Sequence, residues 1–167
     1  MKKEEFAEEF DRINELNQKY KNELEERLKN LLILAQLTLG EFFLSKGFIH
    51  ESSITKFFAR TIDYYYDPKT KVGIKLETPF FTSLDNDYNS ISISIVYKCK
   101  NKFLPGEKRV LFFFRKEEPE NVYKRFKKYM GKTEMKKMKD ILRRKYPKEM
   151  IISDRSEKIN NINNQNK

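Results

Sequence analysis

The chain contains few of the residues that metal, redox and nucleotide sites usually require. Its 167 residues include one cysteine, one histidine, five glycines and no tryptophan. A single cysteine, Cys99, excludes a disulfide within the chain and favours a reducing compartment. With His50 as the only histidine and no glycine-rich phosphate loop, the sequence predicts neither a metal site nor a cofactor of a standard type.

Long uninterrupted apolar runs are also scarce. The most apolar segment, Leu31 to Leu39, is soon followed by Glu41 and Lys46. It therefore falls short of the roughly 18 uninterrupted residues that a membrane-spanning helix needs. The first ten residues carry acids where a targeting peptide would be basic. We expect an intracellular, cytoplasmic protein with no membrane partner.

Charge is distributed unevenly along the chain. The net charge is +10, yet residues 1–50 carry 8 basic against 10 acidic side chains. Residues 98–167 carry 22 basic against 9 acidic side chains, a local excess of +13. Such a concentration of one sign is typical of a surface that meets a polyanion.

Hydrophobic periodicity predicts an α+β fold. Apolar residues from Phe6 to Ala35 recur on average every 3.6 positions, which predicts one long helix over about residues 3–46. Ser52 or Ser53 is a suitable N-cap for a short second helix ending before Asp67. Period-two alternation predicts strands over residues 71–77 and 90–99. A turn at Pro105-Gly106 is predicted to precede a third strand over residues 108–115. Because the connections are short, we expect a three-stranded antiparallel β-meander.

Two basic helices are predicted to complete the fold. The first begins at Pro119 and runs to about Met130, and the second begins after Thr133 and ends near Pro147. The segment from Ser153 onward is polar and low in complexity, so we expect residues 153–167 to be a disordered tail. The predicted organisation is one domain over residues 1–152, followed by that tail.

The basic side chains of these last two helices are the candidate binding residues. The apolar stripes must face the core, so the charges are directed outward, and only Glu134 and Asp140 oppose them. The predicted nucleic-acid-binding residues are Lys124, Arg125, Lys127, Lys128, Lys132, Lys136, Lys137, Lys139, Arg143, Arg144 and Lys145.

The leading hypothesis is a small binding protein that contacts the phosphate backbone of DNA or RNA through these helices. The alternative is a protein-interaction module or inhibitor that binds a nucleoprotein or another acidic partner through the same surface. The lysines could also form only a solvated face. A third interpretation is association with a membrane surface through the basic amphipathic helices, although the core explains their apolar stripes better. The acidic first half of the long helix is marginal in isolation, so we expect it to pack on its own domain, form a homodimer or bind another protein.

Catalysis is not predicted, although one enzymatic alternative remains open. Carboxylates and lysines suitable for a metal-dependent nuclease occur at Glu77, Asp85, Asp87, Lys98 and Lys100. The aromatic run Phe112–Phe114 beside Arg109 and Arg115 resembles a base-stacking platform. A strand buried on both faces explains that run better.

Overall fold

The computed structural model describes residues 3–55, 60–77, 91–112 and 118–165. Helix α1, Lys3–Ser45, is close to the predicted long helix. It continues through Gly40 and ends before Gly47, whose φ of +85° is the left-handed conformation that glycine adopts without a steric penalty.

Five strands follow in the described part of the chain, in place of the predicted three. They are β1 Ile49–Thr55, β2 Arg60–Tyr66, β3 Val72–Glu77, β4 Ile91–Cys99 and β5 Lys102–Phe112. Each pairs antiparallel with the next, so the sheet order is β1-β2-β3-β4-β5. The meander prediction is confirmed for β3 to β5, at the level of antiparallel pairing between sequence neighbours.

The predicted second helix is wrong, because its ends form β1 and β2. Ser52 and Ser53 lie in a strand and pair with Asp63 and Ile62. The apolar spacing in this segment fits a helical stripe, but its isoleucine, threonine and tyrosine residues favour the extended chain. Hydrogen bonding to the neighbouring strand, which the local pattern does not reveal, decides in favour of the sheet.

The predicted turn at Pro105-Gly106 is also wrong. The chain turns instead at Lys100, whose φ is +50°, and both Pro105 and Gly106 lie within β5. The β4–β5 register shifts between Ser94 and Val96, as at a β-bulge. A Cβ at Gly106 would lie 2.8 Å from the carbonyl oxygen of Ile95, so glycine permits this close approach of the two strands.

The sheet is strongly curved. Strands β2 and β5 are separated by two others, which in a flat sheet would put them roughly 14 Å apart. Yet the rings of Tyr64 on β2 and Phe103 on β5 are stacked with centroids 4.0 Å apart. Lys98 on β4 likewise reaches Glu51 on β1. The face that carries these side chains is therefore concave.

Helices cover the opposite face of the sheet. Leu39 and Phe43 of α1 are fully buried in one cluster with Ile74, Ile95 and Tyr97 of the sheet. The ring of Phe43 lies 5.7 Å from Phe126 and 5.6 Å from Tyr123 of the C-terminal part, both edge-on. Aromatic contacts therefore join the last turns of α1 to the first C-terminal helix.

The C-terminal part is helical throughout the described residues. It contains α2 Pro119–Lys127, a 3-10 turn η1 Lys128–Met130, α3 Lys132–Lys145 and α4 Pro147–Gln165. The two predicted basic helices correspond to α2 with η1 and to α3. The predicted disordered tail from residue 153 differs from the structure, where α4 continues to Gln165 and buries Met150 and Ser153.

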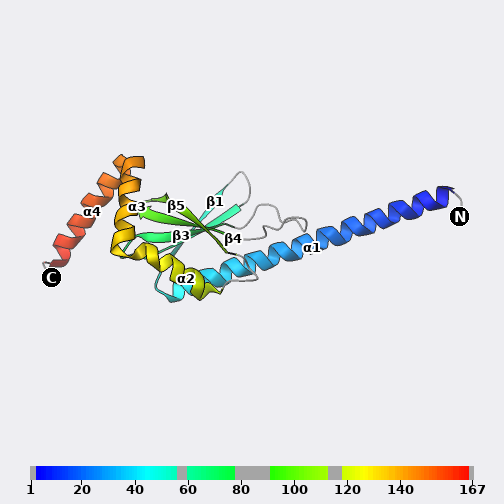
Figure 1. The fold of residues 1–167 in the computed structure, drawn as a ribbon, viewed down its shortest axis with the longest axis horizontal. Helices are drawn as coiled ribbons and strands as arrows, with labels where there is room; N and C mark the ends of the chain where they lie inside the picture. Colours follow the sequence, from blue (N-terminus) through cyan, green and yellow to red (C-terminus); the bar gives the residue numbers. More distant parts are fainter. Residues whose placement is uncertain (1–2, 56–59, 78–90, 113–117, 166–167) are drawn as a thin grey trace.

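The molecule is elongated. The N-terminal half of α1 projects away from the sheet as a rod, whereas α3 and α4 lie at the opposite end (Figure 1). The acidic N-terminal part of α1, residues 4–24, which we call the arm, is therefore well separated from the basic helix α3.

Candidate nucleic-acid interface

Two short amphipathic helices position the basic residues. Helix α2 buries Val122 and Phe126, and α3 buries Leu142, so each helix has one face fixed in the core. The remaining faces carry the lysines and arginines and are turned to solvent. As predicted, most of the candidate binding residues are exposed, the exceptions being Arg125 and Lys139, which are half-buried.

A subset of these cations has no acidic neighbour in the described part of the chain. We call this subset the free basic cluster. It consists of five exposed residues: Lys127, Lys128, Lys132, Lys136 and Arg144. Lys127, Lys128 and Lys132 surround the η1 turn between α2 and α3, and Lys136 follows Lys132 one helical turn later.

Two other predicted binding residues hold α4 in place instead. Lys139, with 17% of its side chain exposed, lies 3.2 Å from Glu157. Arg143 donates to Asp154 at 3.2 Å and to Asp140 at 3.0 Å. Sequence reasoning assigned only local acids to this face, because it treated the segment that carries Asp154 and Glu157 as disordered.

Tyr97 links this ion-pair network to the sheet. Its hydroxyl donates to Glu157 at 2.8 Å and lies 3.4 Å from the hydroxyl of Ser153. Burial raises the pKa of Tyr97; the Ser153 hydroxyl acts against this, and the hydrogen bond to Glu157 adds to it. The pKa of Arg143 is raised as well: partial burial acts to lower it, and the bonds to Asp154 and Asp140 outweigh that effect.

The other predicted residues have partners of their own or are only partly exposed. Lys137 lies 3.0 Å from Glu134, and Lys124 lies 3.9 Å from Glu120, both within one helical turn. The ammonium of Lys145 lies 5.5 Å from the centroid of the Tyr146 ring. Exposed pairs of this kind are worth a fraction of a kcal/mol, so they compete only weakly with a phosphate.

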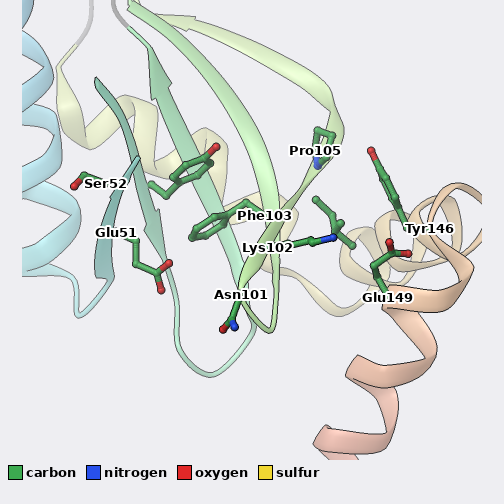
Figure 2. Close-up of a pocket in the computed structure, with 10 residues that line it drawn as sticks. Glu51, Ser52, Asn101, Lys102, Phe103, Pro105, Tyr146 and Glu149 are labelled. Carbon is green, nitrogen blue, oxygen red and sulfur yellow. The ribbon is translucent and has the colours of Figure 1, made fainter. Parts of the chain in front are cut away.

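Sequence reasoning missed an aromatic and charged cluster on the concave face of the sheet. The ammonium of Lys98 lies 4.2 Å from the Phe103 ring centroid and 2.5 Å from Glu51, and only 10% of its side chain is exposed. A pocket of about 500 Å³ lies beside the cluster, bounded by Phe103 and Lys102 on one side and by Tyr146 and Glu149 on the other (Figure 2). Strand alternation placed Lys98 opposite the core face, but only the sheet's curvature brings it to β1.

The residues of the nuclease alternative are not brought together in the described part. Glu77 lies 2.9 Å from Lys75, and Lys98 is paired with Glu51. Asp85 and Asp87 lie outside the described residues, as do Phe113 and Phe114 of the aromatic run. Within the described residues, no group of three histidine, cysteine or acidic side chains is placed to hold a metal ion.

His50 lies on strand β1 rather than at a junction between helices. Its Nε2 atom is 2.8 Å from Asp63 Oδ1, and its ring is stacked on Tyr65 with centroids 4.7 Å apart. The second oxygen of Asp63 accepts a hydrogen bond from Gln36 at 2.5 Å. This chain of contacts joins β1 and β2 to α1.

The lone cysteine, Cys99, is buried, and its thiol donates to the carbonyl oxygen of Glu149 at 3.1 Å. Burial raises its pKa; the hydrogen bond involving Ser153 and the charge of Lys100 act against this, and the charges of Glu149 and Asp154 add to it. The thiol therefore contributes to the contact between β4 and α4.

By length and composition, one described helix, Glu4–Ser45 within α1, qualifies as a membrane-spanning segment. One third of the qualifying window is buried against the fold, and a core helix of a soluble protein passes the same test.

No protein-family model matches the chain, and neither a curated protein nor a solved structure shows a significant match to it.

Proposed function

We propose that this chain is a nucleic-acid-binding protein whose free basic cluster contacts the phosphate backbone. The observation that carries the proposal is the exposure of Lys127, Lys128, Lys132, Lys136 and Arg144 without an acidic partner among the described residues. Cations that already neutralise carboxylates gain little from a phosphate. Unpaired cations gain attraction and also release counterions from the polyanion.

The composition of the cluster favours recognition of the backbone over recognition of base sequence. Four of its five residues are lysines, whose ammonium groups act as point charges and have no planar fork to match a base edge. Arg144 is the one member able to make a bidentate contact with a phosphate or a guanine. We therefore propose binding with weak sequence preference, and a binding role rather than a catalytic one.

Fewer residues than the sequence predicts are proposed to contact the nucleic acid directly. Lys139 and Arg143 are assigned to holding α4, because they already bind Glu157 and Asp154. The local positive field still includes them, but their direct contacts are within the protein. Lys124 and Lys137 form ion pairs with exposed carboxylates. Because such pairs are weak, these two lysines remain able to contact a phosphate.

The test is the binding of purified protein to labelled single- and double-stranded DNA and RNA at low and moderate salt. The key variant replaces the five residues of the free basic cluster by glutamine. A matched control replaces five other exposed cations outside the arm of α1, Lys69, Lys100, Lys102, Arg155 and Lys158, and so removes the same charge elsewhere.

Salt-sensitive binding that is lost in the key variant and kept in the control is the expected result, and it also identifies the preferred nucleic acid. Equal loss in both variants would mean that net charge alone is responsible, and would contradict the assigned surface. Absence of binding by the unmodified protein at low salt would refute the proposal and direct attention to an acidic protein partner.

A further inference from the structure

The projecting half of α1 carries an apolar stripe that is half-exposed. Its members recur every three or four residues and are between 46% and 63% exposed: Phe6, Phe10, Ile13, Leu16, Tyr20 and Leu24. Their average spacing places them along one side of the helix. Leu31, Leu34 and Leu37, further along α1, are also exposed.

Within the described residues, this half of the helix does not pack against the hydrophobic core. Residues 4–24 are exposed without interruption, and the first residue packed against the core is Leu28. Twenty-one helical residues extend about 31 Å. Isolated helices of this length are marginal in water even with favourable sequences, so a partner that covers the stripe would stabilise the helix.

The exposed area is sufficient for an interface between two chains. Large apolar side chains bury roughly 150 to 250 Å² each when fully covered, so six half-exposed ones offer roughly 500 to 600 Å². Two such stripes facing each other would remove roughly 1,000 to 1,200 Å² from water. This lies at the lower end of the range for specific interfaces and is typical of a reversible dimer.

Charge decides the orientation of the two helices. Residues 3–15 carry six acids and two bases, a net charge of −4, whereas residues 16–27 carry three bases and three acids, a net charge of 0. A parallel pair would place the two acidic segments side by side, whereas an antiparallel pair places each acidic segment against a neutral one that contains three bases.

We propose that the arm of α1 binds the same arm of a second copy in antiparallel orientation. The spacing of the stripe suits this arrangement, because Phe6 then lies opposite Leu24 and Phe10 opposite Tyr20, with Ile13 and Leu16 near the two-fold axis. This is an isologous interface, in which the same patch serves both subunits. It leaves the two folded bodies at opposite ends of the paired arms, with their basic helices directed away from each other.

Sedimentation velocity of the full chain from about 1 to 100 μM tests the association. The key variant combines Ile13→Glu with Tyr20→Glu, and the control combines Gln18→Glu with Asn22→Glu, which adds the same charge on the polar side of the helix. We expect a dimer that the key variant weakens by at least about a hundredfold, because each substitution affects both copies. The control should stay dimeric.

A monomer at every concentration would overturn the proposal, as would a dimer that the key variant leaves intact. A monomer that sediments with phosphatidylcholine–phosphatidylglycerol vesicles would assign the stripe to a membrane instead. None of these outcomes depends on nucleic-acid binding, so failure here is distinguishable from failure of the proposed function.

Disulfide cross-linking in a Cys99→Ser background tests the orientation. In the antiparallel pair, Phe6 of one copy faces Leu24 of the other. Because 18 residues separate Leu24 from Phe6 along that second helix, the two copies of Phe6 are about 27 Å apart. Phe6→Cys alone should therefore not cross-link, whereas a mixture of Phe6→Cys and Leu24→Cys chains should do so. Efficient cross-linking of Phe6→Cys to itself would show a parallel pair and overturn the proposed orientation.

Discussion

Removing one cation from the free basic cluster should change the salt dependence of nucleic-acid binding, whereas removing one that holds α4 should not. Each phosphate contact contributes about −0.9 to the slope of log affinity against log salt for duplex DNA. Five contacts predict a slope of about −4.5, which is a loss of about 500-fold in affinity between 50 and 200 mM salt.

The two perturbations are Lys136→Gln and Arg143→Gln, which remove the same charge from the same helix. Lys136 is exposed and unpaired within the described residues, so its loss should reduce the slope to about −3.6, or about 150-fold over the same salt range. Arg143 is already bound to Asp154 and Asp140, so its loss should leave the slope near that of the unmodified protein. Its stability cost should stay within about 1 kcal/mol, because the pairs are partly exposed to solvent.

Fluorescence anisotropy of a labelled duplex, titrated at four or more salt concentrations, measures the slope for each protein. Circular dichroism checks that both variants retain their helical content. Equal flattening of the slope by the two substitutions would refute the distinction between free and committed cations. An unchanged slope for Lys136→Gln would refute the assignment of this residue to a phosphate contact.

Three further results are expected. Phe43→Ala, which removes a fully buried ring from the aromatic cluster, should lower the unfolding free energy by about 3 to 5 kcal/mol in urea titrations, whereas Phe10→Ala on the arm should cost far less in the dilute monomer. Burial, with the charges of Asp63 and Glu41, raises the pKa of Tyr65 to about 12, so its contribution is complete below pH 10 and is lost as the pH rises toward 12. Urea titrations across that pH window should show a loss of stability that is smaller in Tyr65→Phe. Finally, a thiol reagent should label Cys99 slowly in the native protein and quickly in denaturant, because burial disfavours the thiolate; rapid native labelling would contradict this packing.

The two proposals assign different tasks to the two ends of the molecule. The acidic arm would bring two copies together, and the basic helices α2 and α3 on the folded body would each contact a nucleic acid (Figure 1). Two linked binding surfaces increase the apparent affinity for a long polyanion without any new contact. Loss of the dimer should therefore weaken binding to long duplexes more than binding to short ones, which electrophoretic mobility shifts on the two lengths can measure.

Local sequence patterns predicted the elements whose stability depends mainly on their own periodicity. The long helix, the strands β3 and β4 and the two basic helices all carry regular apolar spacing, and each lies close to its predicted position. The exposure of Lys127, Lys128, Lys132 and Lys136 followed from the same reasoning, since an apolar stripe in the core forces the charges outward.

Segments with ambiguous local patterns were decided by contacts between distant residues. Ile62 and Tyr65 fit a helical stripe, yet pairing with β1 and β3 makes their segment a strand. The polar residues from Ser153 onward have no periodic apolar face, yet Tyr97, Lys139 and Arg143 provide partners that hold them against α3 and β4. Such contacts join residues separated by up to 60 positions, and no local window contains both partners.

The sequence by itself determined the charge asymmetry, the long amphipathic helix and the exposure of most of the predicted cations, because these depend on composition and on the geometry of a single helix. Only the tertiary structure decided which cations are free and which are committed, since the acids that neutralise Lys139 and Arg143 arrive with α4. It also decided that the curved sheet brings Lys98 to Glu51 and that the stripe on the arm is half-exposed. Burial and ion pairing are properties of the assembled chain, so they appear only when distant segments are placed together.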